Sequence, residues 1–71
     1  MNKEQLVSYI LARVKDGKQR EAQKLIDEVI ARQERGGLNQ AYIMSITPAA
    51  ISLIKPQYLN DVRKAISNFK G

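Results

Sequence analysis

The spacing of the apolar residues constrains this chain more than any other feature of its sequence. Apolar residues recur at steps of three and four along almost the whole length, which places them on one side of a helix in each segment. No stretch shows the strict apolar and polar alternation of a half-buried strand. The pattern predicts an all-α fold, a small bundle of four to five helices.

The first two predicted helices are joined by a short turn. Asn2 and Gln5 have the spacing of a capping box at the start of the first helix, and Gly17 is predicted to end it. A second amphipathic stretch covers residues 22–30 and stops at the glycine pair 36–37. Because so short a turn brings successive helices alongside each other, we expect an antiparallel αα-hairpin at the beginning of the bundle.

The third stretch, residues 36–54, carries no charge, and eleven of its nineteen residues are hydrophobic. Asn39 suits the N-cap of a helix. Pro48 either kinks that helix or ends it, and we favour a break there because proline cannot donate the helical hydrogen bond. A last helix follows Pro56 to the C-terminus. A chain of 71 residues has room for one small core, so residues 1–71 are expected to form a single helical domain.

The charge-free stretch must be enclosed by other protein, because a helix that is apolar on most sides is not stable in water. In one interpretation it is a central core helix wrapped by the others. In the second, the other helices of so short a chain cannot cover it, and a second copy buries the remaining apolar patch. That interpretation predicts a homodimer. The residues of its interface are Tyr42, Ile43, Met44, Ile46, Ile51 and Ile54.

The charge balance favours acidic partners, since twelve Lys and Arg against seven Asp and Glu give a net charge of +5. The excess lies toward the two ends of the chain. Two groups of residues are candidate contacts for an anion or a nucleic acid, because Arg and Lys hold phosphates and Asn can pair with adenine. They are Arg13, Lys15, Lys18 and Arg20 in the first turn, and Asn60, Arg63 and Lys64 on one face of the last helix. The alternative for both groups is an ordinary solvated surface.

The chemical inventory argues against catalysis. With no Cys and no His, the chain has no thiolate nucleophile, no imidazole base and none of the usual zinc ligands. Nearly all its carboxylates have a basic neighbour, so they should stay ionised, and no phosphate-cradling glycine loop is present. We therefore expect no enzyme, no catalytic residue, no metal or cofactor site and no small-molecule substrate.

The longest uncharged stretch is too short and too polar for a membrane span, and the first residues do not resemble an export signal, so we expect a cytoplasmic protein and no membrane partner. The predicted function is that of a non-enzymatic, small helical protein-interaction module that self-associates through residues 36–54. One alternative is a small basic nucleic-acid-binding regulator that uses the C-terminal helix and the basic turn. Another is an adaptor or inhibitor that docks the same apolar patch on a different protein.

Overall fold

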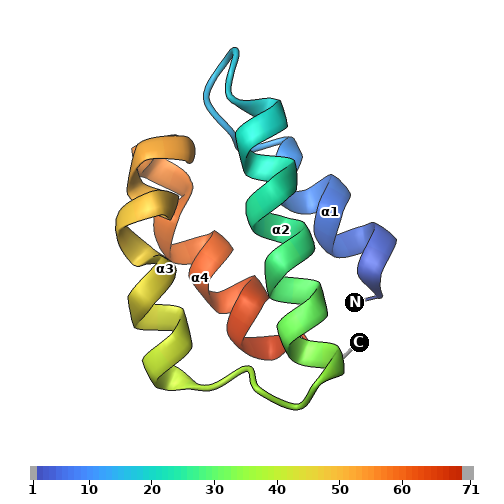
Figure 1. The fold of residues 1–71 in the computed structure, drawn as a ribbon. Helices are drawn as coiled ribbons and strands as arrows, with labels where there is room; N and C mark the ends of the chain where they lie inside the picture. Colours follow the sequence, from blue (N-terminus) through green and yellow to red (C-terminus); the bar gives the residue numbers. More distant parts are fainter. Residues whose placement is uncertain (1, 70–71) are drawn as a thin grey trace.

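The computed structural model describes residues 2–69, in which every regular element is helical (Figure 1). Four α-helices follow one another, and one turn of 3-10 helix, η1, precedes the last. Their bounds are Lys3–Leu11 for α1, Gln19–Glu34 for α2, Gln40–Leu53 for α3, Pro56–Tyr58 for η1 and Leu59–Asn68 for α4. The predicted small all-α bundle is confirmed.

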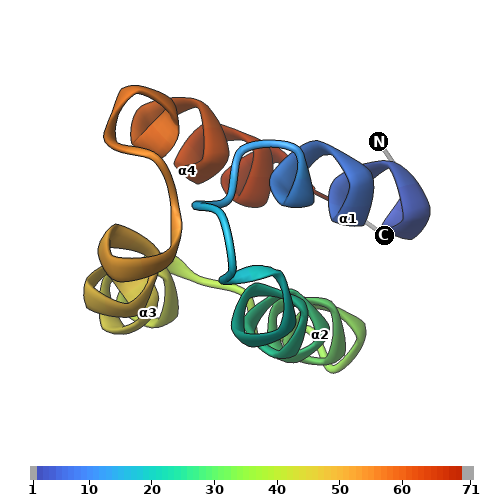
Figure 2. The same cartoon turned by 90° about the horizontal axis from the view of Figure 1, so that it is seen from above.

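The helices are arranged in two layers, with α1 and α4 in one and α2 and α3 in the other (Figure 2). Helix α1 packs on both α2 and α4, and α3 packs on the same two helices. The four helices therefore form a closed ring, so each can turn its apolar side toward a common interior.

The core consists of aliphatic side chains and one phenylalanine. No polar or charged side chain of residues 2–69 is buried among them. The buried residues are Leu6, Ile10, Val14, Ala22, Ile26, Val29, Ile43, Ile46, Ala50, Leu53, Ile54, Val62, Ile66 and Phe69. Within each helix they stand three or four positions apart, as the apolar spacing predicts.

Asparagine caps begin two of the helices. The backbone N–H of Gln5 donates to the side chain of Asn2 over 2.8 Å, and the Gln5 side chain accepts from the backbone N–H of Asn2 over 2.9 Å. At the start of α3, the N–H of Tyr42 donates to the Asn39 side chain over 2.9 Å. Each cap satisfies an N–H group that has no partner within its helix. Both predicted starts are confirmed.

Helix α2 ends in a glycine motif. Gly36 has a φ of 72°, in the left-handed region that suits glycine. Its N–H donates to the carbonyl of Gln33 over 3.0 Å, and the N–H of Gly37 donates to the carbonyl of Arg32 over 2.9 Å. These two bonds define a Schellman motif, so the glycine pair stops the helix as predicted.

Helix α3 continues through Pro48, and the predicted break is wrong. Pro48 cannot donate to the carbonyl of Met44, but both residues are exposed, so water can satisfy that carbonyl. Ile46 before the proline and Ala50 after it both lie in the core. A continuous helix buries both halves of the segment, and this gain outweighs one lost hydrogen bond at the surface.

Helix α1 ends at Leu11, so the predicted end at Gly17 is wrong, and Val14 lies outside the helix. Val14 instead forms an isolated antiparallel bridge with Ile54. The N–H of Lys15 donates to the carbonyl of Leu53 over 2.9 Å, and the N–H of Lys55 donates to the carbonyl of Arg13 over 3.1 Å. The bridge joins the α1–α2 connection to the end of α3.

Candidate functional site

Helix α3 has no charged residue, and the side that it turns away from the core is the first candidate surface. We name this surface the α3 outer face. Its residues are Ala41, Met44, Ser45, Pro48, Ala49, Ile51 and Ser52, all exposed. Met44 is 62% exposed and Ile51 is 52% exposed, and they are the large hydrophobic side chains most open to solvent among residues 2–69. An uncharged helix face that keeps such side chains in water is a candidate contact surface.

The structure divides the six residues predicted for a protein interface. Ile43, Ile46 and Ile54 are 7%, 9% and 2% exposed and belong to the core of their own chain. The prediction must be corrected for these three, because a partner cannot reach side chains that the other helices already cover. Met44 and Ile51 are open to a partner. One side of this helix therefore belongs to the core, whereas the opposite side is exposed.

Tyr42, the sixth residue, is half-buried beneath an arginine. The Cζ atom of Arg32 lies 4.5 Å from the centroid of the Tyr42 ring, and the Nε of Arg32 donates to the carbonyl of Gly37 over 3.1 Å. Burial raises the pKa of Tyr42 above its ordinary value of 10.0, and nearby Glu28 raises it further, while Arg32 and Arg35 lower it. The ring therefore fastens α3 to the end of α2.

Arg13, the first residue of the predicted basic group, is fixed by aromatic rings. Its Cζ atom lies 3.7 Å from the centroid of the Tyr9 ring and 5.5 Å from that of Tyr58. One terminal nitrogen donates to the carbonyl of Tyr9 over 2.8 Å, while the Nε is buried without a hydrogen-bond partner. This stacking holds α1 against η1 through cation–π attraction.

Lys15, in the connection between α1 and α2, contacts the C-terminal end of α3. Its Nζ lies 3.5 Å from the carbonyl oxygen of Ile51, and its backbone N–H donates to the carbonyl of Leu53. A cation is favourable there, because the carbonyls of a helix C-terminus carry partial negative charge. Lys18 and Arg20 are exposed near the start of α2. The four basic residues of the turn therefore have different surroundings and do not line one site.

A groove between α3 and α4 collects the polar residues of the exposed side of α4. We name it the α3–α4 groove. Gln40 and Ile43 of α3 line it, together with Asn60, Arg63, Lys64, Ser67 and Asn68 of α4. The structure thus brings together the three residues predicted on the last helix. Gln40 was missed because no sequence pattern pairs it with α4. Arg63 also borders a hollow with Met44, Thr47 and Pro48, so the groove adjoins the α3 outer face.

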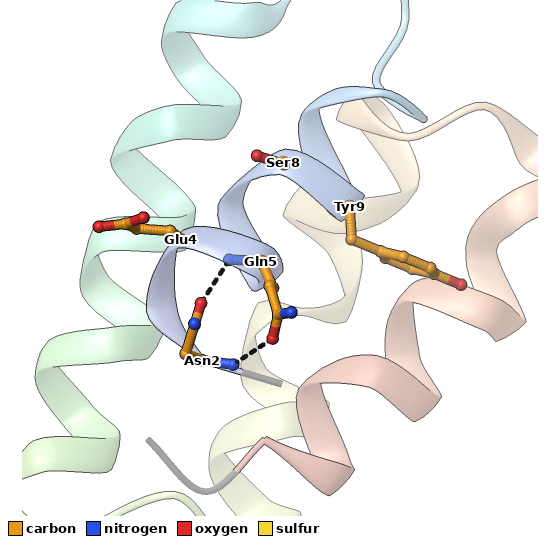
Figure 3. Close-up of a pocket in the computed structure, with 5 residues that line it drawn as sticks. All are labelled: Asn2, Glu4, Gln5, Ser8 and Tyr9. Carbon is orange, nitrogen blue, oxygen red and sulfur yellow. Dashed lines mark hydrogen bonds between the residues drawn. The ribbon is translucent and has the colours of Figure 1, made fainter.

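A further hollow lies along α1, lined by Asn2, Glu4, Gln5, Ser8 and Tyr9 (Figure 3). The figure shows Asn2 and Gln5 bonded to each other in the capping box and the Tyr9 ring directed toward α4. The side-chain amides of Asn2 and Gln5 thus cap α1, and Tyr9 stacks on Arg13. These groups have structural partners, so this hollow is a weaker candidate than the two surfaces of α3 and α4.

Two findings concern other kinds of site. Within residues 2–69, no three carboxylate side chains lie close enough together to hold a metal ion. No helix in this part of the chain combines the length and the apolar character needed to cross a membrane.

The chain was compared with protein-family models, with curated proteins and with solved structures, and none of the three comparisons found a match.

Proposed function

We propose that this protein is a non-enzymatic interaction module that forms a homodimer through the α3 outer face. The observation that carries the proposal is the exposure of Met44 and Ile51 on a helix with no charge. Burial of a large apolar side chain contributes about 1.5–3 kcal/mol relative to leaving it in water. Contact with a second surface that covers these two side chains is therefore favourable.

A second copy of the chain is the partner that the charges favour. Each copy carries a net charge of +5, so most pairs of faces repel when two copies meet. The α3 outer face is free of charge, so two such faces can approach without contact between like charges. In addition, Ala41, Ser45 and Ala49 are small and would let two helices lie close together. A two-fold pair places the same patch on both sides, as isologous interfaces require.

The size of the face suits a small interface. Helix α3 has 14 residues, a length of about 21 Å. A typical interface buries about 800 Å² on each partner, which is roughly one-sixth of the 4557 Å² accessible surface of this chain. Two α3 helices that cross near Pro48 would reach this area only with help from neighbouring side chains.

The test is the molar mass in solution, measured by light scattering at low micromolar concentration. We expect a dimer of the natural chain and a folded monomer of Ile51→Lys, because a buried unpaired charge costs several kcal/mol. Ser8→Lys is the matched control, since it adds the same charge at an exposed position of α1 and should leave the dimer intact.

A natural chain that is monomeric at this concentration contradicts the proposal. The same is true if Ser8→Lys dissociates the dimer as strongly as Ile51→Lys, because the effect would then come from net charge. Circular dichroism on each variant shows that the helices remain folded. For the location of the protein we propose the cytoplasm, since the core closes without a disulfide and needs no oxidising compartment.

A further inference from the structure

The α3–α4 groove is rich in hydrogen-bond donors that have no use inside the protein. The hydrogen bonds of residues 2–69 do not involve the side chains of the six polar residues that line it. The ion pair of Lys3 with Glu34 is the one pair in this part of the chain, so Arg63 and Lys64 have no carboxylate within bonding distance. The chemistry of the groove therefore favours a ligand that accepts hydrogen bonds and carries negative charge.

The nearest acidic side chain on the same helix lies beside the groove. Asp61 lines a neighbouring hollow with Tyr9 and Lys64. Asp61 is one residue from Asn60, so the two side chains point about 100° apart on the helix. The groove itself is lined by no acidic residue. A bound anion would thus meet two cations and four amide or hydroxyl groups there.

The composition of the groove favours phosphate over a protein surface. Protein partners bind through aromatic or aliphatic anchors, and the apolar residue of this groove, Ile43, is only 7% exposed. Phosphates are instead held by Arg and Lys together with Asn, Gln and Ser, the set present here. The two surfaces of the molecule therefore differ in chemistry: the α3 outer face is apolar and uncharged, whereas the groove is polar and cationic.

We propose that the α3–α4 groove binds the phosphate backbone of a nucleic acid. Asn60 and Ser67 are seven residues apart, which is about 10 Å along α4. That length is about two turns of the helix, so neighbouring phosphates of one strand can meet the groove along α4. Arg63 and Lys64 supply the charge, and Asn60, Ser67 and Gln40 donate to phosphate and sugar oxygens. This inference is independent of the proposed dimer.

The experiment measures binding of a fluorescein-labelled DNA duplex of two helical turns, about 20 base pairs, by fluorescence anisotropy over a series of salt concentrations. We expect the logarithm of the affinity to fall with the logarithm of salt with a slope of about −2, for two phosphate contacts. Arg63→Gln and Lys64→Gln should each make the slope shallower by about 0.9 and lower the affinity about tenfold at low salt.

Lys24→Gln is the matched control, because it removes the same charge from an exposed position of α2, in the other layer from α4 (Figure 2). It should leave the affinity and the slope almost unchanged. The proposal is overturned if the natural chain does not bind at low salt, or if Lys24→Gln weakens binding as much as Lys64→Gln. It is also overturned if polyglutamate displaces the duplex as effectively as unlabelled DNA, since the groove would then select only negative charge. Light scattering on the same samples shows separately whether the dimer forms.

Discussion

At the residue scale, two arginines connect the elements of this bundle through contacts with tyrosine rings. The guanidinium of Arg13 lies over Tyr9 of α1 and near Tyr58 of η1, and that of Arg32 lies over Tyr42 of α3. An arginine can stack on a ring and donate hydrogen bonds at the same time, whereas lysine lacks the planar group. Part of the positive charge of the chain is therefore used for packing.

The environment of Tyr42 predicts a loss of stability at alkaline pH. Burial raises the pKa of its hydroxyl in the folded state, so the unfolded chain loses this proton first as the pH rises past 10.0. The unfolded state then binds fewer protons than the folded state, and the free energy of unfolding falls with further increase in pH. The contribution is fully present below pH 10.0 and is lost as the pH rises through the pKa of the folded state.

Urea denaturation of the natural chain and of Tyr42→Phe, at about pH 9 and about pH 11, measures this effect. The natural chain should lose more stability between the two pH values than the variant, in which the hydroxyl is missing. An equal loss in both proteins would show that other groups account for the alkaline sensitivity.

At the scale of the element, α3 is the helix in which local rules and packing conflict. It contains a proline in its interior and has no cation in its last turn. The structure compensates for both. Core residues on either side of Pro48 keep the helix continuous, and Lys15 reaches the terminal carbonyls from the α1–α2 connection. Tertiary contacts therefore decide the length of this helix.

We predict that Pro48→Ala stabilises the folded chain by about 1–3 kcal/mol. Alanine at position 48 supplies the N–H donor that the Met44 carbonyl lacks, and alanine has the best helix propensity. Part of the gain is offset by the greater freedom of the unfolded chain. The midpoint of urea denaturation measures the change. Ala49→Gly, at the exposed neighbouring position, should instead destabilise by about 1 kcal/mol. A loss of stability in Pro48→Ala would mean that the proline ring makes a necessary contact.

At the scale of the whole molecule, the closed ring of helices encloses a small core and leaves one helix face uncharged. Chains of this size gain only a few kcal/mol from a single core, and a partner that binds the folded state adds to it by mass action. In the proposed dimer, the exposed apolar residues of α3 belong to a second, shared interior.

The dimer proposal predicts a melting temperature that depends on protein concentration. Each tenfold increase adds about 1.4 kcal/mol per dimer, which corresponds to an increase of a few degrees for chains of this length. Differential scanning calorimetry of the natural chain and of Ile51→Lys over a wide concentration range measures it. The variant should melt at a constant temperature, and a constant value for the natural chain would argue against a dimer.

Much of the fold follows from local features of the sequence. The spacing of apolar residues predicted a bundle of four to five helices and their buried sides, the caps at Asn2 and Asn39 marked two starts, and Gly36 marked an end. Each of these features depends on neighbours within one or two turns. The site was predicted in part. The charge-free segment and the polar face of α4 are visible in the sequence, but which residues of α3 face outward depends on where α2 and α4 lie.

By itself, the sequence determined the helical class, the helix starts at Asn2 and Asn39, the helix end at Gly36, and the absence of charge from residues 36–54. The tertiary structure alone decided that α3 runs through Pro48, that Val14 pairs with Ile54, and that Gln40 joins the α4 residues in a groove. The physical reason is distance along the chain. Contacts between segments many residues apart depend on how whole helices pack, and this packing buries enough apolar surface to override the preference of a single residue.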